Sequence, residues 1–270
     1  RPARGYPPSV RRRLALAALA AAAAAALTLS ACGGQGNDDG AAAPDASPDA
    51  SPDASTDVSA DGPTEGGRVP VDPPDCLPDG ARAHRAGPES TPTLVAVVGE
   101  GETGVVLAPQ NGGDWCQWAG EVARLVAAGH TVVTFTWSAD SAASLELAVD
   151  AVRDAGVRAF ALVGASKGGT YSAALADELE PAAVVALSPP AEFEGVDARA
   201  AVSGYTGPLL VVASADDRDT PAASSREVAR EDATYLEVPG GAHGVRILEG
   251  ESADEVRAAM DATLAEGLGG

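Results

Sequence analysis

The stretch around Ser166 constrains the fold of this 270-residue chain more than any other. An apolar run, Ala159–Val163, stops at Gly164, and Gly168 opens an alanine-rich segment just beyond the serine. This composition predicts a buried strand, a sharp turn with a serine at its tip, and a helix over 170–180. The glycines suit such a turn, because side chains there would collide with backbone where strand and helix fold close together.

The chain from about residue 93 onward alternates strand-like and helix-like segments. The expected strands span 93–98, 104–108, 131–137, 158–163, 183–187, 209–213 and 234–238, and the expected helices span 114–128, 141–155, 170–180, 221–230 and 252–265. The glycine-rich link 99–103 predicts a hairpin between the first two strands, and Asp114 is expected to cap the first helix. This alternation predicts an α/β fold with a doubly wound, mostly parallel sheet and helices on both faces.

Three strand ends carry residues suited to nucleophilic chemistry. Ser166 follows one strand and His243 follows the last, while Asp216, Asp217 and Asp219 follow the strand between them. In a doubly wound sheet, ligands bind at the carboxyl ends of the strands. A serine hydroxyl needs a base to take its proton, and a carboxylate can orient a histidine for that task. A serine, an aspartate and a histidine at these strand ends therefore make a candidate catalytic triad.

Residues 94–264 resemble the α/β-hydrolase superfamily. The likeness includes the elbow Gly164-Ala165-Ser166-Lys167-Gly168, which fits the Gly-x-Ser-x-Gly pattern, and the turn at 241–244. The chain is most similar to the small, lidless members related to dienelactone hydrolases, which implies a minimal cap or none. It departs from the usual pattern at Pro109-Gln110, where relatives carry His-Gly. The stretch 189–206, where many relatives insert a cap, is short.

The resemblance implies a role for each residue of the triad. Ser166 would be the nucleophile, His243 the general base and Asp217 the acid, because the family places its acid in an Asp-x-x-x-Pro sequence after this strand. Asp216 and Asp219 remain competitors for the acid. The structural alternatives are a turn serine at 166, a surface-loop histidine at 243, and Asp217 as the cap of the helix expected at 221–230.

Backbone N–H groups would complete the site. Those of Lys167 and Asn111 are expected to hold the oxyanion, with Gln110 as the alternative to Asn111. The side chain of Lys167 is expected to be solvated. The three tryptophans, Trp115, Trp118 and Trp137, are expected to cluster near the active-site face. Trp115 and Trp137 are candidates to line the substrate pocket, and packing in the core is the alternative.

The N-terminal region predicts export. Residues 1–31 read as a signal peptide, with a basic start, an apolar run over 14–29 and an end that resembles the bacterial lipobox. In that family the cysteine is diacylated, which implies that Cys32 is the lipid carrier and that the protein is anchored on the outer face of the cell membrane. A transmembrane helix is the alternative. The repeated Pro-Asp-Ala-Ser unit predicts a disordered tether over 32–75, followed by the folded domain at 76–270.

Cysteine usage and net charge limit the covalent links and the partners that this chain can be expected to have. With Cys32 used for lipidation, Cys76 and Cys116 are expected to form one disulfide in an oxidising compartment, with two free thiols as the alternative. No metal-ligand spacing is evident in the sequence, and no cofactor is expected. The formal net charge of −21 argues against nucleic acid and anionic lipid as electrostatic partners.

Two classes of function are compatible with this sequence. The first is a serine hydrolase that cleaves an ester or related acyl bond of a small molecule, with a peptidase or acyltransferase as variants that use the same triad. The second is a non-catalytic cell-surface protein that uses the same fold for binding, since a fold alone does not determine function. The short cap region predicts an open cleft.

Overall fold

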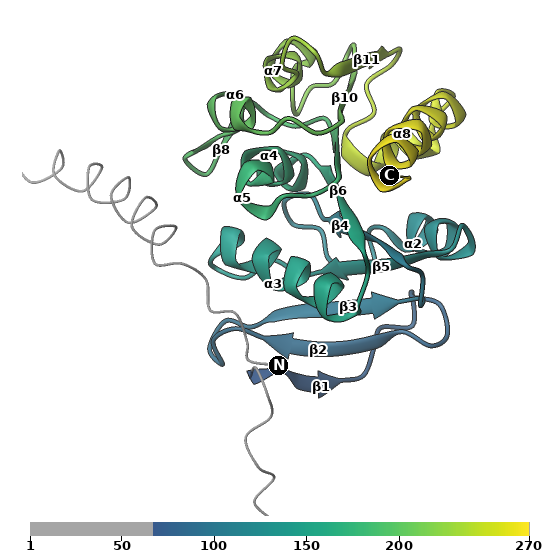
Figure 1. Ribbon diagram of the computed structural model, residues 1–270. Helices are drawn as coiled ribbons and strands as arrows, with labels where there is room; N and C mark the ends of the chain where they lie inside the picture. The colour runs from purple at the N-terminus through teal and green to yellow at the C-terminus, as the bar shows by residue number, and fades with distance from the viewer. Residues whose placement is uncertain (1–66, 270) are drawn as a thin grey trace, which may run out of the picture. The chain divides into compact units, whose positions relative to one another are not determined.

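The computed structural model describes residues 67–269, which contain one nine-stranded sheet flanked by helices (Figure 1). The strands are β1 (Val69–Val71), β2 (Arg82–Ala86), β3 (Thr93–Val98), β4 (Thr103–Ala108), β5 (His130–Phe135), β6 (Ala159–Ala165), β7 (Ala183–Leu187), β8 (Glu192–Phe193), β9 (Val196–Asp197), β10 (Leu209–Ser214) and β11 (Thr234–Val238). The helices are α2 (Ala119–Ala127), α3 (Ser141–Asp154), α4 (Lys167–Ala174), α5 (Ala176–Leu179), α6 (Ala198–Ala201), α7 (Ala222–Val228) and α8 (Ala253–Leu268), with short 3-10 turns η2 (Val202–Gly204) and η3 (Gly244–Glu249).

The order of strands in the main sheet is β1-β2-β3-β5-β4-β6-β7-β10-β11, and β8 pairs only with β9. From β5 to β11 all neighbours are parallel, whereas β1, β2 and β3 form an antiparallel edge that joins β5. Parallel strands buried on both faces are expected to be continuous apolar runs, as in the strands at 183–187 and 209–213. The predicted α/β class with a mostly parallel sheet is confirmed.

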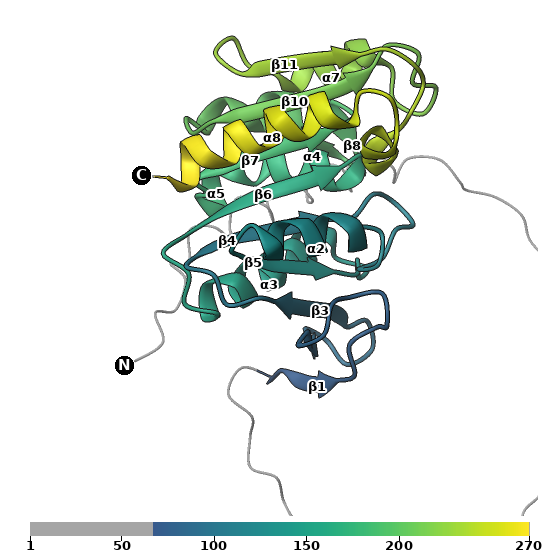
Figure 2. The same ribbon diagram turned by 90° about the vertical axis from the view of Figure 1, so that its right-hand side faces the viewer.

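Helices cover both faces of the sheet, and each face has its own apolar core. Buried side chains of α3, α4, α6 and α7 pack in one core, and those of α2, η3 and α8 pack in the other. Figure 2 shows α2 and α8 on the face turned toward the viewer. Within β4 the residues alternate between the two, with Val106 in the first core and Val105 and Leu107 in the second. This alternation follows from the two-residue period of a strand.

The expected hairpin between β3 and β4 is wrong. β5 lies between them, antiparallel to β3 and parallel to β4. The glycines of the link serve a close crossing instead of a tight turn. A Cβ on Gly101 would lie 1.9 Å from the carbonyl oxygen of Gly129, and one on Gly99 would lie 2.7 Å from that of His130. The link therefore passes directly against the start of β5, where any side chain would collide with backbone.

Two other boundaries differ from expectation. Asp114 does not cap a helix: its Oδ1 accepts from the N–H of Cys116 at 2.8 Å, and α2 begins only at Ala119 after a series of turns. Regular structure also begins before Cys76, because β1 lies inside the range assigned to the tether and pairs with β2.

The predicted signal peptide, the lipidation site at Cys32 and most of the tether lie outside the described residues. Within 67–269, none of the helices combines the length and apolar character needed to cross a membrane.

Candidate active site

Ser166 sits between β6 and α4 in a strained backbone conformation, with φ 49° and ψ −117°. Its N–H donates to the carbonyl oxygen of Leu187 at 2.7 Å, which fixes the turn to the neighbouring strand. A Cβ on Gly164 would lie 2.2 Å from the carbonyl oxygen of Gly168, and one on Gly168 would lie 2.2 Å from that of Ala108. The glycines on both sides of the serine are therefore required by backbone contacts, as the sequence predicts.

Asp217 and His243 form a hydrogen-bonded pair. Oδ2 of Asp217 lies 2.8 Å from Nδ1 of His243, and the two side chains are 1% and 14% exposed. Oδ1 of the same aspartate accepts from the N–H groups of Asp219 and Thr220, which orient the carboxylate from its other side. The alternative role of Asp217 as a helix cap is wrong, since α7 follows Pro221 and has no side-chain cap. An aspartate in this position fixes the tautomer and orientation of the imidazole.

The turn that carries His243 packs against the serine elbow. The N–H of Gly244 donates to Oγ of Ser188, which directly follows β7, at 3.2 Å. A Cβ on Gly244 would lie 3.4 Å from the Cβ of Ala165, the residue before the serine. Within the described residues no hydrogen bond joins Ser166 Oγ to the histidine, a kind of contact that in enzymes often tightens only when substrate is bound.

The loop after β4 supplies the other candidate residues for the oxyanion. The N–H of Gln110 donates to Oε1 of Gln117 at 2.8 Å, so this group is already used. Asn111 comes next in the chain and is exposed. Because the N–H of Gln110 already has a partner, the N–H of Asn111 is the better candidate to donate to the oxyanion. Lys167 begins α4, where backbone N–H groups are free of helical partners. No sequence pattern points to Gln117, because its role depends on how the loop folds back.

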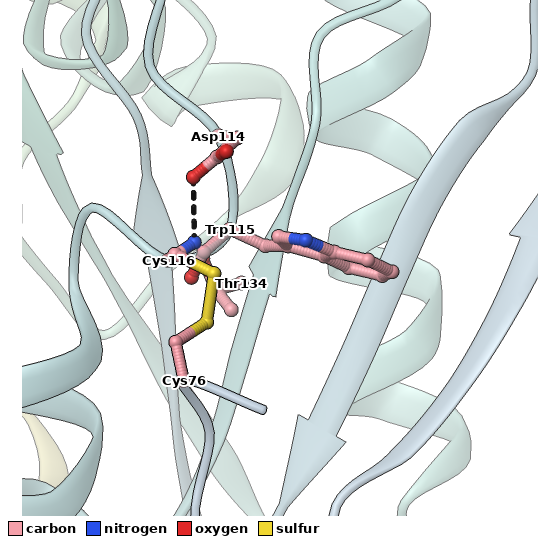
Figure 3. The surroundings of a disulfide bond; sticks show 5 residues. All are labelled: Cys76, Asp114, Trp115, Cys116 and Thr134. Atoms are coloured by element: carbon pink, nitrogen blue, oxygen red, sulfur yellow. Dashed lines mark hydrogen bonds between the residues drawn. A yellow bond between two sulfur atoms is a disulfide. The ribbon is translucent and has the colours of Figure 1, made fainter. Parts of the chain in front are cut away.

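Cys76 and Cys116 form the predicted disulfide, with their Cα atoms 5.7 Å apart (Figure 3). Around it, Asp114 Oδ1 accepts from the N–H of Cys116, and Thr134 Oγ1 donates to the carbonyl oxygen of Trp115 at 3.4 Å. The disulfide thus ties the loop between β1 and β2 to the residues just before Gln117. A covalent link at this point limits the movement of the candidate oxyanion loop.

The side chain of Lys167 is buried, so the expectation of a solvated lysine is wrong. It is 6% exposed and its Nζ lies 2.9 Å from Oε2 of Glu194. The ammonium also lies 5.0 Å from the ring centre of Trp137 and 5.8 Å from those of Tyr171 and Phe193. A carboxylate and aromatic faces stabilise an ammonium that has lost water. Trp137 follows β5, and Phe193 and Glu194 belong to the β8–β9 hairpin. Because these partners are distant from Lys167 in the chain, the sequence does not reveal them.

The tryptophans do not form one cluster. Trp137 packs on the core beside α3 and α4, and its Nε1 donates to the carbonyl oxygen of Pro109 at 2.9 Å. Trp115 packs against the opposite core, and there Trp118 is only 1% exposed. Trp137 therefore remains next to the elbow through Lys167 and Pro109, whereas Trp118 is a core residue.

Asp217 and His243, together with Asp219, also bring three potential metal-ligand atoms within 4.8 Å of one another. The 2.8 Å contact between the first two is shorter than the ~3.3 Å between ligands in tetrahedral zinc geometry. It matches a hydrogen bond. The arrangement therefore fits an Asp–His pair better than a metal site.

No family model and no curated protein matches this sequence. Solved structures do match. A monoacylglycerol lipase from Paleococcus ferrophilus has a TM-score of 0.55 and 19% identity over 64% of this chain and 98% of its own. An enol-lactonase from Burkholderia xenovorans has a TM-score of 0.56 and 18% identity over 67% and 100%. An alpha-beta serine hydrolase homologue from Coxiella burnetii has a TM-score of 0.53 and 19% identity over 67% and 96%. These likenesses identify the fold as that of the α/β-hydrolases.

Proposed function

We propose that this protein is a serine hydrolase that cleaves an ester or related acyl bond through an acyl-enzyme. The observation that carries the proposal is the 2.8 Å contact between Asp217 and His243, on a turn packed beside the strained elbow at Ser166. Strain of this kind concentrates at functional sites. A protein that used the fold only for binding would have no need of an oriented Asp–His pair next to such a serine.

In the proposed reaction, Ser166 Oγ attacks the carbonyl carbon of the ester while Nε2 of His243 takes its proton. Asp217 stabilises the imidazolium, and the N–H groups of Lys167 and Asn111 donate hydrogen bonds to the carbonyl oxygen, where negative charge develops. Collapse breaks the bond to the alcohol, which receives the proton from the histidine. Water then repeats the sequence on the acyl-enzyme, releasing the acid and the free serine.

The solved structures that share the fold include proteins named as a lipase, a lactonase and a serine hydrolase homologue, and these names support a hydrolase. A peptidase or an acyltransferase would use the same residues, so the choice of ester substrates is the finer part of the proposal. The substrate is a small molecule. The strongly negative chain disfavours nucleic acid as a partner.

We further propose that the protein is a lipoprotein attached through Cys32 to the extracytoplasmic face of the cell membrane. The lipobox-like end of the signal peptide and the Cys76–Cys116 disulfide, which suits an oxidising compartment, support this location. Metabolic labelling with a fatty acid should tag the wild-type chain and not Cys32→Ser. Equal labelling of both chains, or none of either, would count against the anchor.

Hydrolysis of p-nitrophenyl acetate by the purified protein tests the enzymatic proposal. Ser166→Ala should abolish turnover above background, and Asp217→Asn should lower kcat by about 10⁴, the loss seen when a triad histidine is held in the wrong tautomer. Asp216→Asn and Asp219→Asn serve as matched controls and should retain most activity. Full activity in Ser166→Ala would refute the proposal, and an unchanged rate in Asp217→Asn would assign the acid elsewhere.

A further inference from the structure

The segment 189–206 contains a small hairpin, β8–β9, followed by α6 and η2, and the hairpin is fixed at its base. β8 and β9 are joined by Glu194 and Gly195, both with positive φ, the conformation of a tight two-residue hairpin turn. At the base, Arg199 donates to Glu192 and to Glu227 on α7, each at 2.6 Å. Surface ion pairs contribute little singly, but this one arginine links the hairpin, α6 and α7.

The tip of the hairpin is fixed more firmly, through Glu194. Its carboxylate accepts from Lys167 Nζ, from Ser141 Oγ and from Tyr171 OH, all between 2.9 and 3.1 Å. Burial raises the pKa of Glu194, but these hydrogen bonds and the charge of Lys167 more than offset it, so the pKa lies below its usual value. The tip is therefore held as a carboxylate against the residue that follows Ser166.

A cavity of about 580 Å³, broadly open to solvent, lies between this hairpin and the turn that leads from β5 into α3. Its volume falls within the ~300–1,000 Å³ range of small-molecule sites. Lys167 forms one wall, which places the cavity next to the elbow in the chain, on the side where the strands end at their carboxyl termini. The polar lining comes from Ser138, Asp140, Ser141, Tyr171 and Glu194.

Charge disfavours ionic ligands in this cavity. An anion would meet the carboxylates of Asp140 and Glu194, while Lys167 already has a carboxylate partner. A cation would find the aromatic faces of Trp137 and Tyr171 occupied by the lysine ammonium. The carboxylate of Glu194 already accepts from three donors, so only the exposed Asp140 is left for a cation.

An alkyl chain would gain little, because polar groups share the lining about equally with apolar ones and the aliphatic side chains, Ala139, Ala142 and Val196, are small. A neutral group with several hydroxyls can use what remains. Its hydroxyls can donate to Asp140, whose Oδ1 also caps α3 by accepting from Ala143 N. They can also donate to Oγ of Ser141 and to the hydroxyl oxygen of Tyr171, whose own hydrogens are donated to Glu194. Polar groups placed in a pocket fix orientation and specificity in this way.

We propose that this cavity is the substrate subsite of the hydrolase and that it selects esters with an uncharged, polyhydroxylated half over alkyl esters. The inference rests on the proposed function, since it names the substrate class of the same site. Sites that hydrogen-bond the hydroxyls of a substrate discriminate against analogues that lack them.

Matched ester pairs test the proposal on either side of the scissile bond. Glycerol monobutyrate is compared with propyl butyrate, and ethyl 3,4-dihydroxybutyrate with ethyl butyrate, each as kcat/KM relative to p-nitrophenyl acetate. We expect a preference of about tenfold or more for the hydroxylated member of at least one pair. Ala142→Leu, which fills the cavity, should reduce that preference. Ala143→Leu is a matched control on the same helix, outside the cavity lining, and should keep it.

The outcomes separate this inference from the proposed function. No preference in either pair, an equal preference in Ala142→Leu and wild type, or better hydrolysis of butyrylcholine or of butyryloxyacetate would overturn the subsite. If the protein nevertheless turns over p-nitrophenyl acetate through Ser166, the hydrolase proposal stands. If folded wild type hydrolyses none of these esters, including the aryl acetate, the proposed function itself fails.

Discussion

Removal of the Cys76–Cys116 disulfide should destabilise the folded domain by a predictable amount. The two cysteines are 40 positions apart in the chain. If the link acts by restricting the unfolded chain, closing a loop of this length removes roughly 13 cal/mol/K of entropy, which is about 4 kcal/mol at 25 °C. A typical domain is stable by only ~5–15 kcal/mol, so the loss is large. The perturbation is Cys76→Ser/Cys116→Ser in a Cys32→Ser background, which leaves no other thiol.

Urea unfolding, followed by fluorescence, measures the effect. With a slope of ~1–3 kcal/mol/M, a loss of about 4 kcal/mol should lower the midpoint by more than about 1 M. Dithiothreitol should shift the parent protein by a similar amount and leave the double serine variant unchanged. The reasoning is refuted if the double variant and the oxidised parent unfold at the same midpoint, or if the reductant shifts both proteins equally.

Two further predictions concern the elbow and the hairpin. Gly168→Ala should cost about 2–3 kcal/mol of stability, because its Cβ would lie 2.2 Å from the carbonyl oxygen of Ala108. Gly120→Ala is the control on a helix and should gain ~0.5–1 kcal/mol, because the space around its Cα is open. Equal stability changes for the two variants in calorimetry would contradict this prediction. Glu194→Gln should be less stable than wild type at pH 7, because it leaves Lys167 without its counter-charge. Because the pKa of Glu194 is lowered in the folded state, the stability that its carboxylate contributes is full above pH 4.5, its ordinary pKa, and is lost as the pH falls through the folded-state pKa. The difference in stability between wild type and Glu194→Gln should therefore narrow on acidification. A difference that widens would contradict the assignment.

The parts of the site that the sequence predicted are those set by short-range contacts. Gly164 and Gly168 are required by backbone within a few residues or on the next strand, and such requirements are visible as a pattern. Strand and helix positions were likewise predictable from apolar runs. Ser166, Asp217 and His243 could be named because parallel strands place their carboxyl ends at one edge of the sheet.

The errors involve partners distant in sequence. The glycines at 99 and 101 suit a hairpin equally well, and only the insertion of β5 between β3 and β4 shows that they allow a crossing. Burial of Lys167 depends on aromatic rings and on Glu194 from elements far along the chain. A lone lysine in a sequence gives no sign of such partners, since lysines are mostly exposed.

Covalent labelling of the full-length protein with a fluorophosphonate tests the central claim most directly, because this reagent reacts with a serine only when an adjacent base activates it. The account predicts one adduct, located by peptide mass spectrometry on Ser166, and its loss in both Ser166→Ala and His243→Ala. Folded wild-type protein that remains unlabelled, or an adduct that persists in His243→Ala, would contradict the account.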